Sequence, residues 1–201
     1  MIKIGLCGSS GAGKGYVCEI FKEYGAQYID TDKVYGKIAV AGSDCVKELC
    51  MFFGEGILNE DGSLNKKKLS SKVFESANAS QHLKVLNTVT HKYIRETVEK
   101  MLEKFEKKGE KAVIIDAPVL FESGFNEMCD VTMCITAPKE LKIERIMKRD
   151  RITYKKALAR IESQLTDEVL RSLCTYEVVN DGTRDLKEQI FAVLSELGLA
   201  K

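Results

Sequence analysis

Short apolar runs alternate along the chain with longer stretches in which apolar residues recur every three or four positions. The apolar runs predict five strands, at residues 2–7, 27–30, 112–116, 131–136 and 175–179. The three-to-four spacing predicts helices at residues 16–24, 139–148 and 184–197. Strands whose residues are nearly all apolar are typical of parallel sheets buried on both faces. The pattern therefore predicts an α/β fold with a five-stranded, mainly parallel sheet flanked by helices.

An interval of about 80 residues separates the second predicted strand from the third, which is too long for an ordinary crossover. Helical spacing fills most of it, at residues 43–53, 65–74 and 77–106. We therefore expect a helical insertion at 36–109. A second excursion, rich in Arg, Lys and Glu, covers 149–173. What remains of this single domain is a core formed by residues 1–35, 110–148 and 174–201.

The charge balance limits the classes of partner. Lys and Arg number 31 against 30 Asp and Glu, a net charge of +1. Such a balance argues against a protein that binds nucleic acid or an anionic membrane through bulk electrostatics. No apolar run approaches the roughly 18 residues of a membrane span. We expect neither nucleic acid nor a membrane as partner.

Seven cysteines raise the question of a disulfide framework or a metal site. Their number is odd, no two form a CxxC pair, and the chain has only two histidines. The chain opens with a strand that leads directly into a glycine loop, not with the apolar run of a secretory leader. We expect reduced thiols that pack in the interior of a cytoplasmic protein.

The sequence GSSGAGKG at residues 8–15 matches the phosphate-binding pattern G-x-x-x-x-G-K, placed between a predicted strand and a predicted helix. Its glycines allow the backbone to wrap around phosphate oxygens, and Lys14 adds a positive charge. We expect ATP to contact the loop and the first helical turn, at Gly8, Gly11, Ala12, Gly13, Lys14, Gly15 and Tyr16. The loop departs from the usual pattern after its lysine. Gly15 and Tyr16 stand where Ser or Thr commonly ligates magnesium.

Two acidic positions follow predicted strands, where an open parallel sheet places its ligand crevice. Asp32 comes just after the second strand and is a candidate general base or holder of metal-bound water, or else only the cap of the next helix. Asp116 ends the third strand and is a candidate second support for hydrated magnesium, or else part of a plain turn before Pro118.

A cluster of basic residues lies around the second excursion. Its members are Arg145, Lys148, Arg149, Arg151 and Arg160. Phosphoryl transfer needs cations over the transferred phosphate, often delivered by a mobile segment. We expect at least one of Arg145, Arg149 and Arg160 to reach phosphate, and the other charges of this stretch to be solvated. His91, inside a helical pattern, is by its position alone more typical of packing or surface than of catalysis.

Taken together, these segments resemble the dephospho-coenzyme A kinase family almost end to end. GLCGSSGAGKGYV is similar to the phosphate loop of that family and YIDTDKV to its Asp-x-Asp element. FGEGILNEDGSLNKKKL with KVF resembles its substrate-binding insertion, and THKYIRE its His-containing helix. DAPVLFESGF, ERIMKRD, ARIESQL and VVNDGTRDLKEQI resemble, in order, its acidic segment, the two parts of its lid and its closing strand and helix. The order and spacing of these segments make the likeness specific.

The resemblance implies transfer of the ATP γ-phosphate to the 3′-hydroxyl of dephospho-CoA, with Mg²⁺, to complete coenzyme A. It makes Asp32 the base and Lys14, Arg149 and Arg160 the catalytic cations. It makes Asp32, His91, Phe121 and Glu122 substrate contacts, residues 36–109 the CoA-binding insertion and 149–173 the lid. Asp32 and Asp116 would hold magnesium through water.

The chain departs from the family pattern at three places. They are Gly15-Tyr16 for Ser-Thr, Gly36 for a frequent Arg, and Lys92 for Pro. Two alternatives stay open, namely a nucleoside-monophosphate or other small-molecule kinase and a non-catalytic nucleotide-binding relative. The oligomeric state is open as well, and a monomer is compatible with the sequence.

Overall fold

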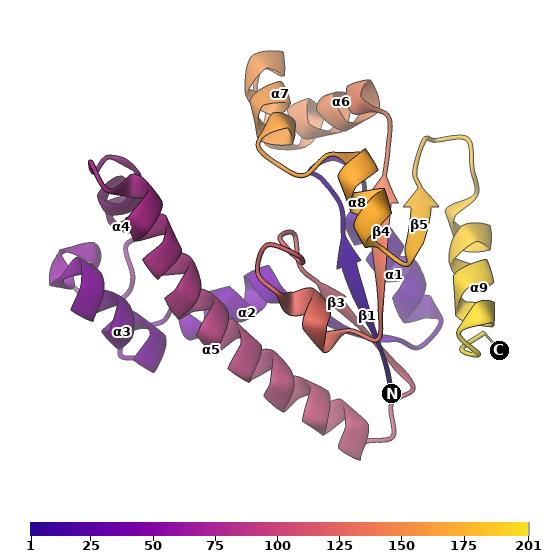
Figure 1. Ribbon diagram of the computed structural model, residues 1–201, viewed down its shortest axis with the longest axis horizontal. Coiled ribbons are helices and arrows are strands. Elements are labelled where there is room, and N and C mark those ends of the chain that lie inside the picture. Colours follow the sequence, from indigo (N-terminus) through magenta and orange to yellow (C-terminus); the bar gives the residue numbers. More distant parts are fainter. Residues whose placement is uncertain (201) are drawn as a thin grey trace. The chain divides into compact units, whose positions relative to one another are not determined.

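The computed structural model describes residues 1–200, which form two compact units. The first unit consists of Met1–Ile29 together with the chain from Lys104 onward, and the second of Asp30–Glu103. The first unit contains the core of the sheet and the phosphate loop (Figure 1).

Five strands form one sheet in the order β2-β3-β1-β4-β5. Their bounds are β1 Ile2–Cys7, β2 Gln27–Asp30, β3 Ala112–Asp116, β4 Val131–Thr136 and β5 Tyr176–Val179. Strand β1 pairs in parallel with β3 on one side and β4 on the other, and β4 pairs in parallel with β5. The predicted five-stranded, mainly parallel sheet is confirmed.

The register of the sheet decides which side chains reach its carboxyl edge together. Leu6 is the partner of Asp116, and Cys7 is the partner of Cys134. The loop that follows Cys7 therefore begins beside the end of β3, and Asp116 lies at the same edge as the phosphate loop.

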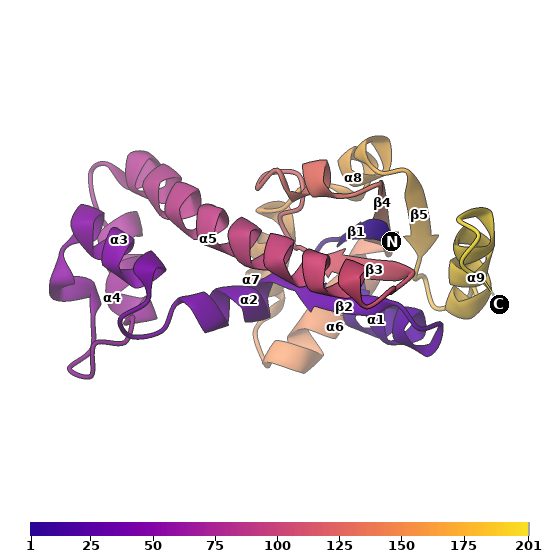
Figure 2. The ribbon, with the colours of Figure 1, turned by 90° about the horizontal axis from the view of Figure 1, so that it is seen from below.

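The helices of the first unit lie on both sides of its sheet. Their bounds are α1 Lys14–Glu23, α6 Lys139–Asp150, α7 Tyr154–Glu162, α8 Asp167–Leu173 and α9 Leu186–Glu196. Helices α1 and α9 cover one face, where Phe21 and Ile190 join Ile4 and Ile135 of the strands in one buried cluster. Helix α8 packs on β4, and Figures 1 and 2 show it apart from α1 and α9. Helices α6 and α7 pack on each other.

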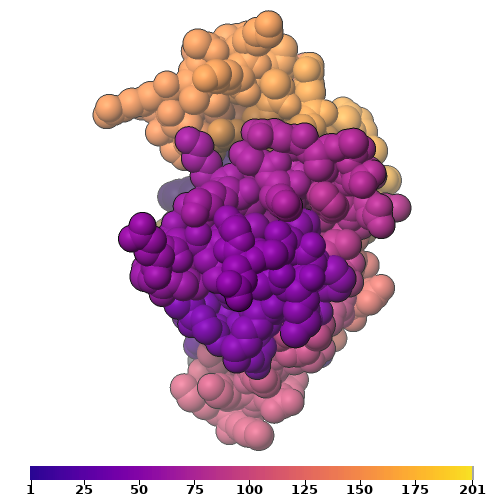
Figure 3. Space-filling model, turned by 90° about the vertical axis from the view of Figure 1, so that its left-hand side faces the viewer, coloured from indigo at the N-terminus to yellow at the C-terminus, as the bar shows by residue number. Residues whose placement is uncertain are grey.

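The second unit is helical. It contains α2 Thr31–Ile38, α3 Asp44–Phe53, α4 Lys66–Phe74 and most of α5, Ala79–Lys107, with a short 3-10 turn at Glu55–Ile57. Its core contains Leu49 of α3, Ile57 of the 3-10 turn, Val73 of α4 and Val89 of α5. Figure 3 faces the surface of this unit, whose atoms are coloured purple and magenta.

One difference from the expected elements arises from local capping. Asp30 ends β2 and starts α2, which the sequence pattern did not predict, because its Oδ1 accepts a hydrogen bond from the Lys33 amide at 3.0 Å. Helix α1 begins at Lys14, two residues before the first periodic apolar position. A 3-10 turn at Phe125–Met128 was also not predicted.

Candidate functional site

The carbonyl groups of the phosphate loop are held by partners within the first unit. Arg145, on α6, donates from its NH1 to Gly11 O at 3.2 Å and to Ala12 O at 3.5 Å. The Asn180 side-chain amide, just after β5, donates to Ala12 O at 2.8 Å. These contacts occupy two carbonyl oxygens in the second half of the loop, those of Gly11 and Ala12.

Four backbone N–H groups in the second half of the loop have no hydrogen-bond acceptor within the described part of the protein; we call them the open amides. Among residues 1–200, the backbone N–H groups of Gly11, Gly13, Lys14 and Gly15 donate to no protein acceptor. Three of them belong to the last residue before α1 and its first two residues, where a helix has unsatisfied donors and a partial positive charge. Consecutive open donors of this kind form an anion site. The loop is therefore built to receive phosphate oxygens.

Gly11 and Gly13 are two of the loop positions that require glycine. Gly13 has φ 100°, and a Cβ there would lie 2.1 Å from Asn180 Nδ2. Gly11 has φ 80°, and a Cβ there would lie 2.5 Å from the backbone oxygen of Lys142. At Gly15, by contrast, a Cβ would meet nothing within 4 Å. The close approach of α6 and Asn180 to the loop thus depends on Gly11 and Gly13, and Gly15 is free to vary sterically.

Lys14 is the cation of the loop. Its Nζ donates to Gly8 O at 3.0 Å, so the side chain folds back along the loop. Tyr16, which stands where a metal-binding hydroxyl would be usual in related loops, is 60% exposed. Lys14 lies where the sequence pattern placed it, at the first residue of α1.

Asp116 lies at the carboxyl edge of the sheet with two neighbours. Its Oδ2 accepts a hydrogen bond from Tyr28 Oη at 2.8 Å and a weak one from Cys18 Sγ at 3.9 Å. Burial, together with the carboxylate of Asp116, raises the pKa of Cys18 to about 12, and the same two causes raise that of Tyr28. Both groups stay protonated at neutral pH, so they act as donors that orient the carboxylate.

Asp32 lies in the first turn of α2, in the second unit. Its side chain is exposed and takes part in no hydrogen bond or ion pair with another described residue. The cap of α2 is Asp30, not Asp32. The alternative hypothesis, that Asp32 is only the N-cap of this helix, is therefore wrong.

Arg149 and Arg160, the two arginines that the resemblance places in a lid, donate to the same carboxylate, that of Asp150. Arg149 donates from Nε and NH2 to the two oxygens of Asp150 at 2.8 and 3.0 Å, and Arg160 also donates to Asp150. Hydrogen bonding from Arg149 lowers the pKa of Asp150 to about 2. The structure thus brings together two cations that are 11 positions apart in the chain.

The remaining expected substrate contacts belong to other elements. His91 is on α5, where burial and then the neighbouring charge of Arg95 lower its pKa. Lys92, which stands where the family pattern has Pro, donates to Glu48 on α3 at 2.8 Å. Phe121 and Glu122 belong to the turn between β3 and the 3-10 turn at Phe125–Met128, and Glu122 lines a small hollow of about 60 Å³ with Gly8 and Gln164.

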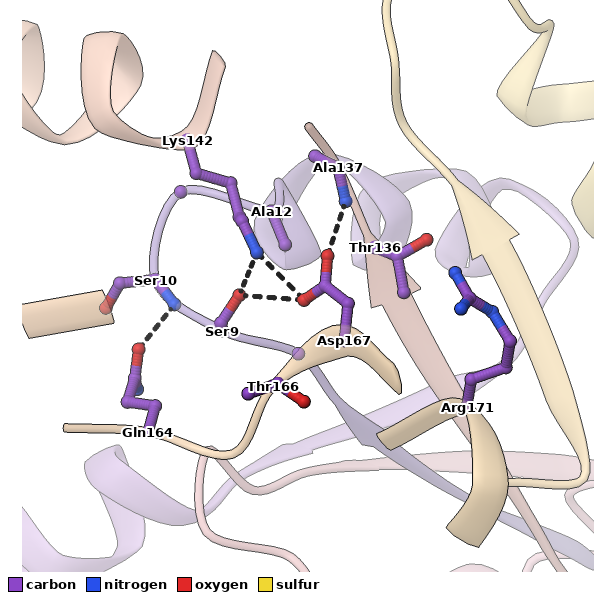
Figure 4. A network of polar contacts seen from close by, with 12 residues as sticks. Ser9, Ser10, Ala12, Thr136, Ala137, Lys142, Gln164, Thr166, Asp167 and Arg171 are labelled. Carbon is purple, nitrogen blue, oxygen red and sulfur yellow. Dashed lines mark hydrogen bonds and ion pairs between the residues drawn. The ribbon is translucent and has the colours of Figure 1, made fainter. Parts of the chain in front are cut away.

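Several residues that hold the loop were not candidates from the sequence. They are Ser9, Lys142, Asp167 and Asn180, and Figure 4 shows the first three joined by hydrogen bonds. Asn180 could have been chosen from the sequence because it directly follows a strand, at the same edge of the sheet as Asp116, the last residue of β3. The sequence points less clearly to Lys142, which lies three residues before the candidate Arg145 on the same helix.

The part of the chain that the structure describes has neither a protein metal-ligand cluster nor a membrane-spanning helix. Residues 1–200 contain no group of three or more His, Cys, Asp or Glu side chains that could hold a metal ion. No helix in that part of the chain is both long and apolar enough to cross a membrane. A metal at this site would therefore depend on ligands other than a protein cluster.

Comparisons with known proteins are consistent with the geometry. Residues 2–185 match the family model described as dephospho-CoA kinase. A dephospho-CoA kinase of Lactobacillus johnsonii is 37% identical over 97% of this chain and 98% of its own length. One from Corynebacterium glutamicum is 32% identical over 98% of this chain and all of its own length.

Solved structures agree in fold. A protein of Thermus thermophilus superposes with a TM-score of 0.82 at 28% identity, over 98% of this chain and 97% of its own. A dephospho-CoA kinase from Campylobacter jejuni gives a TM-score of 0.70 at 26% identity, over 97% and 96%. A shikimate kinase from Acinetobacter baumannii, at 17% identity and a TM-score of 0.51 over 98% and 94%, shares the fold alone.

Proposed function

This chain belongs to the dephospho-CoA kinase family, and from that premise we propose which of its residues carry out the reaction. The chain is a kinase that uses ATP to phosphorylate dephospho-CoA, the step that completes coenzyme A. A match over residues 2–185 decides against the two alternatives, another small-molecule kinase and a non-catalytic relative. The roles of single residues are the substance of the proposal.

The open amides of the phosphate loop carry the proposal. Four donors without a protein acceptor, in a loop whose carbonyls are bound elsewhere, favour phosphate oxygens as their partners. Lys14 leaves Gly8 O to join them, because an ionised phosphate is a stronger acceptor for ammonium than a neutral carbonyl. The loop residues Gly8, Gly11, Ala12, Gly13, Lys14, Gly15 and Tyr16 form the ATP site.

Asp32 takes or directs the proton of the acceptor hydroxyl. Its carboxylate is exposed, has no partner among the described residues and follows the carboxyl end of β2 by two residues. A general base needs an available lone pair within reach of the proton it accepts, and a carboxylate already engaged as a cap would lack it. This availability distinguishes Asp32 from its neighbour Asp30.

Arg149 and Arg160 supply mobile positive charge. Both side chains are largely exposed, at 60% and 43%, and their shared partner Asp150 stays ionised. A phosphate group competes well for guanidinium groups that are held only at the surface. We assign residues 149–173 the role of lid over the nucleotide.

Magnesium fits this site only with an aqueous shell. No cluster of three acidic, His or Cys side chains is present among residues 1–200, and Gly15 offers no hydroxyl. Magnesium commonly keeps several waters and binds through substrate phosphates. The ion neutralises charge on the outer phosphates when it is bound. Asp32 and Asp116 would hold waters of its shell, and Tyr28 orients Asp116 for that purpose.

The remaining assignments concern the acceptor and the cell. Residues 36–109 form the insertion that binds dephospho-CoA, with His91, Phe121 and Glu122 as contacts, and residues 1–35, 110–148 and 174–201 form the core. ATP and dephospho-CoA are the small-molecule partners, with no nucleic acid or membrane. We place the enzyme in the cytoplasm, and its oligomeric state stays open, a monomer being compatible with the proposed roles.

The assignment of Asp32 is tested by release of ADP with dephospho-CoA, with AMP and without acceptor. Asp32→Asn should lower turnover with dephospho-CoA on the order of 10²–10⁴-fold and leave ATP affinity nearly unchanged. Asp30→Asn is the matched control, because Asn also caps helices well, and it should keep normal turnover. Near-normal turnover of Asp32→Asn would refute the assignment.

The magnesium assignment is tested by the ion concentration needed for half-maximal rate and, separately, by calorimetry of ATP binding at several ion concentrations. Gly15→Ser should lower the required concentration, since the position is open to a side chain, whereas Gly15→Ala should not. Asp116→Asn should raise it while still accepting from Tyr28. Equal ion dependence in all four proteins would contradict the assignment.

A further inference from the structure

A buried polar cluster lies beneath the first half of the phosphate loop. Lys142 Nζ donates to Ser9 Oγ at 3.0 Å and to Asp167 Oδ1 at 2.8 Å, and Ser9 Oγ lies 3.3 Å from the same oxygen (Figure 4). The Lys142 side chain is only 6% exposed and that of Asp167 14%. We call Ser9, Lys142 and Asp167 the Ser9 cluster.

The three members of the Ser9 cluster come from three separate segments. Ser9 follows β1, Lys142 lies in the first turn of α6, and Asp167 begins α8. Asp167 Oδ2 also accepts a hydrogen bond from the Ala137 amide at the end of β4 at 3.3 Å. A buried ammonium group is tolerated only when it is paired and hydrogen-bonded, so the position of each segment constrains the other two.

A second contact reaches the loop from the same connection. Gln164 Oε1 accepts a hydrogen bond from the Ser10 amide at 2.8 Å. Gln164 lies in the short segment that joins α7 to α8, Asp167 is the first residue of α8 directly after it, and α7 carries Arg160. This connection therefore holds the first half of the loop, while Arg145 and Asn180 hold the second half.

We propose that Lys142, through its pair with Asp167, is a positioning residue for phosphoryl transfer. The Ser9 cluster and Gln164 hold Ser9 and Ser10 against the α7–α8 connection, so the direction of the open amides and the base of the lid are set together. Lys142 does not reach the nucleotide in this role. The proposal rests on the ATP site proposed above but assigns work to residues outside it.

The physical reason is the sensitivity of catalysis to small displacements. A shift of about 1 Å in a group that orients the reacting atoms can lower the rate on the order of 10²-fold. Stability responds differently, because replacing both members of a buried ion pair by neutral groups of similar volume is often tolerated. Positioning and folding can therefore be separated with a neutral pair of substitutions.

The test compares three proteins, the wild type, Lys142→Met/Asp167→Asn and the control Lys187→Met/Glu23→Gln. In the double variant Met keeps the volume of the lysine stem, and Asn can still accept from the Ala137 amide. The control removes an exposed ion pair of 2.8 Å that joins α9 to α1 and lies outside the loop and the proposed lid. Each protein is measured for thermal midpoint, for Kd of ATP and of dephospho-CoA by calorimetry, and for the single-turnover rate of ADP formation with saturating substrates.

We expect the double variant to melt within a few degrees of the wild type and to bind dephospho-CoA normally, while its single-turnover rate falls on the order of 10–10²-fold. The control should match the wild type in every measurement. A wild-type rate in the double variant would show that the Ser9 cluster does not position the reacting groups and would overturn the proposal. If the double variant does not fold, Ser9→Ala takes its place with the same expected rate loss, because it detaches the loop from the cluster and keeps the Lys142–Asp167 pair.

Gln164→Leu tests whether the two contacts act as one unit. It removes the acceptor for the Ser10 amide and leaves the Ser9 cluster intact. Combined with Lys142→Met/Asp167→Asn, it should add less to the rate loss than it causes alone, since residues that act as a unit are not additive. Fully multiplicative losses would show that the contacts work independently and would refute their joint role.

Discussion

The phosphate loop and the segment proposed as a lid, residues 149–173, both lie beside cations, but the structure holds those cations in opposite ways. Beside the loop, Arg145 and Lys142 are hydrogen-bonded to backbone and buried partners. In the proposed lid, the largely exposed Arg149 and Arg160 meet at one partly exposed carboxylate, that of Asp150. The cations beside the loop are fixed in place, whereas those of the proposed lid can exchange a surface partner for another anion. The contrast separates groups that fix geometry from groups that arrive with the substrate.

The largest effect should come from the loop cation itself. Lys14→Met removes the positive charge that follows the transferred phosphate, and turnover should fall on the order of 10³-fold. The thermal midpoint should change little, because among the described residues Lys14 Nζ donates only to the Gly8 carbonyl oxygen. Lys22→Met, which removes a surface pair with Glu19 on the same helix, is the control and should keep its rate. A small rate loss for Lys14→Met would contradict the anion site.

The lid should show a smaller effect on rate and none on acceptor binding. Arg160→Ala or Arg149→Ala should lower turnover on the order of 10²-fold, because each removes a charge donor for the transition state. Kd for dephospho-CoA should stay within about two-fold of the wild type if these side chains reach only phosphate. Lys156→Ala, an exposed change on α7, serves as control. Losses confined to acceptor binding would instead place the arginines in the acceptor pocket.

A glycine substitution separates the fixed loop from its open edge. Gly13→Ala should destabilise the protein by about 1–3 kcal/mol, because of the positive φ and the approach to Asn180. Gly15→Ala, two residues on, should leave the free energy of unfolding unchanged or slightly higher. Urea unfolding with and without ATP measures both. Equal stability of the two variants would contradict the close approach of Asn180 to the loop.

The smallest effect concerns the pH dependence of the lid pair. The pKa of Asp150 lies near 2 in the folded protein, below the usual value of about 3.9. A carboxyl group with a lowered pKa stabilises the protein above its unfolded pKa, and that contribution is lost as pH falls toward 2. The small advantage of the wild type over Asp150→Asn should be equal at pH 7 and pH 5 and shrink at pH 3. Urea midpoints at these three values measure it, and an advantage that grows on acidification would be inconsistent with the pairing.

The sheet could be predicted from the sequence because strands buried on both faces are nearly continuous in apolar residues. Four of the five strand ranges match the structure, and the fifth starts one residue later, at Tyr176. Helix α2 escaped prediction because it depends on one hydrogen bond from the Lys33 amide to Asp30, which periodicity does not register. Hydrophobic spacing thus predicts that an element exists, whereas local capping helps to decide at which residue it begins or ends.

The site was predictable where chemistry lies in a contiguous motif. The phosphate loop and Lys14 could be found from eight consecutive residues, and comparison with known families gave the reaction. The Lys142–Asp167 pair could not, because its members are 25 positions apart and meet only once α6 and α8 are in place. Asp150, the shared partner of the lid arginines, was adjacent to Arg149 in sequence and still missed, since an acidic residue in a charged stretch carries no distinguishing pattern.

The central position of β1 has a consequence for how the chain reaches this structure. The strand pairs with β3 and β4, beginning with Ile2 opposite Ala112, so β1 is synthesised well before the strands on either side of it. At 5–20 residues per second, that delay is on the order of 5–20 s on the ribosome. During it an apolar segment has no sheet to join, and long-range pairing of this kind slows folding. Newly made chains should therefore depend on protection of β1 until β3 emerges, and refolding should be limited by assembly of the sheet around β1.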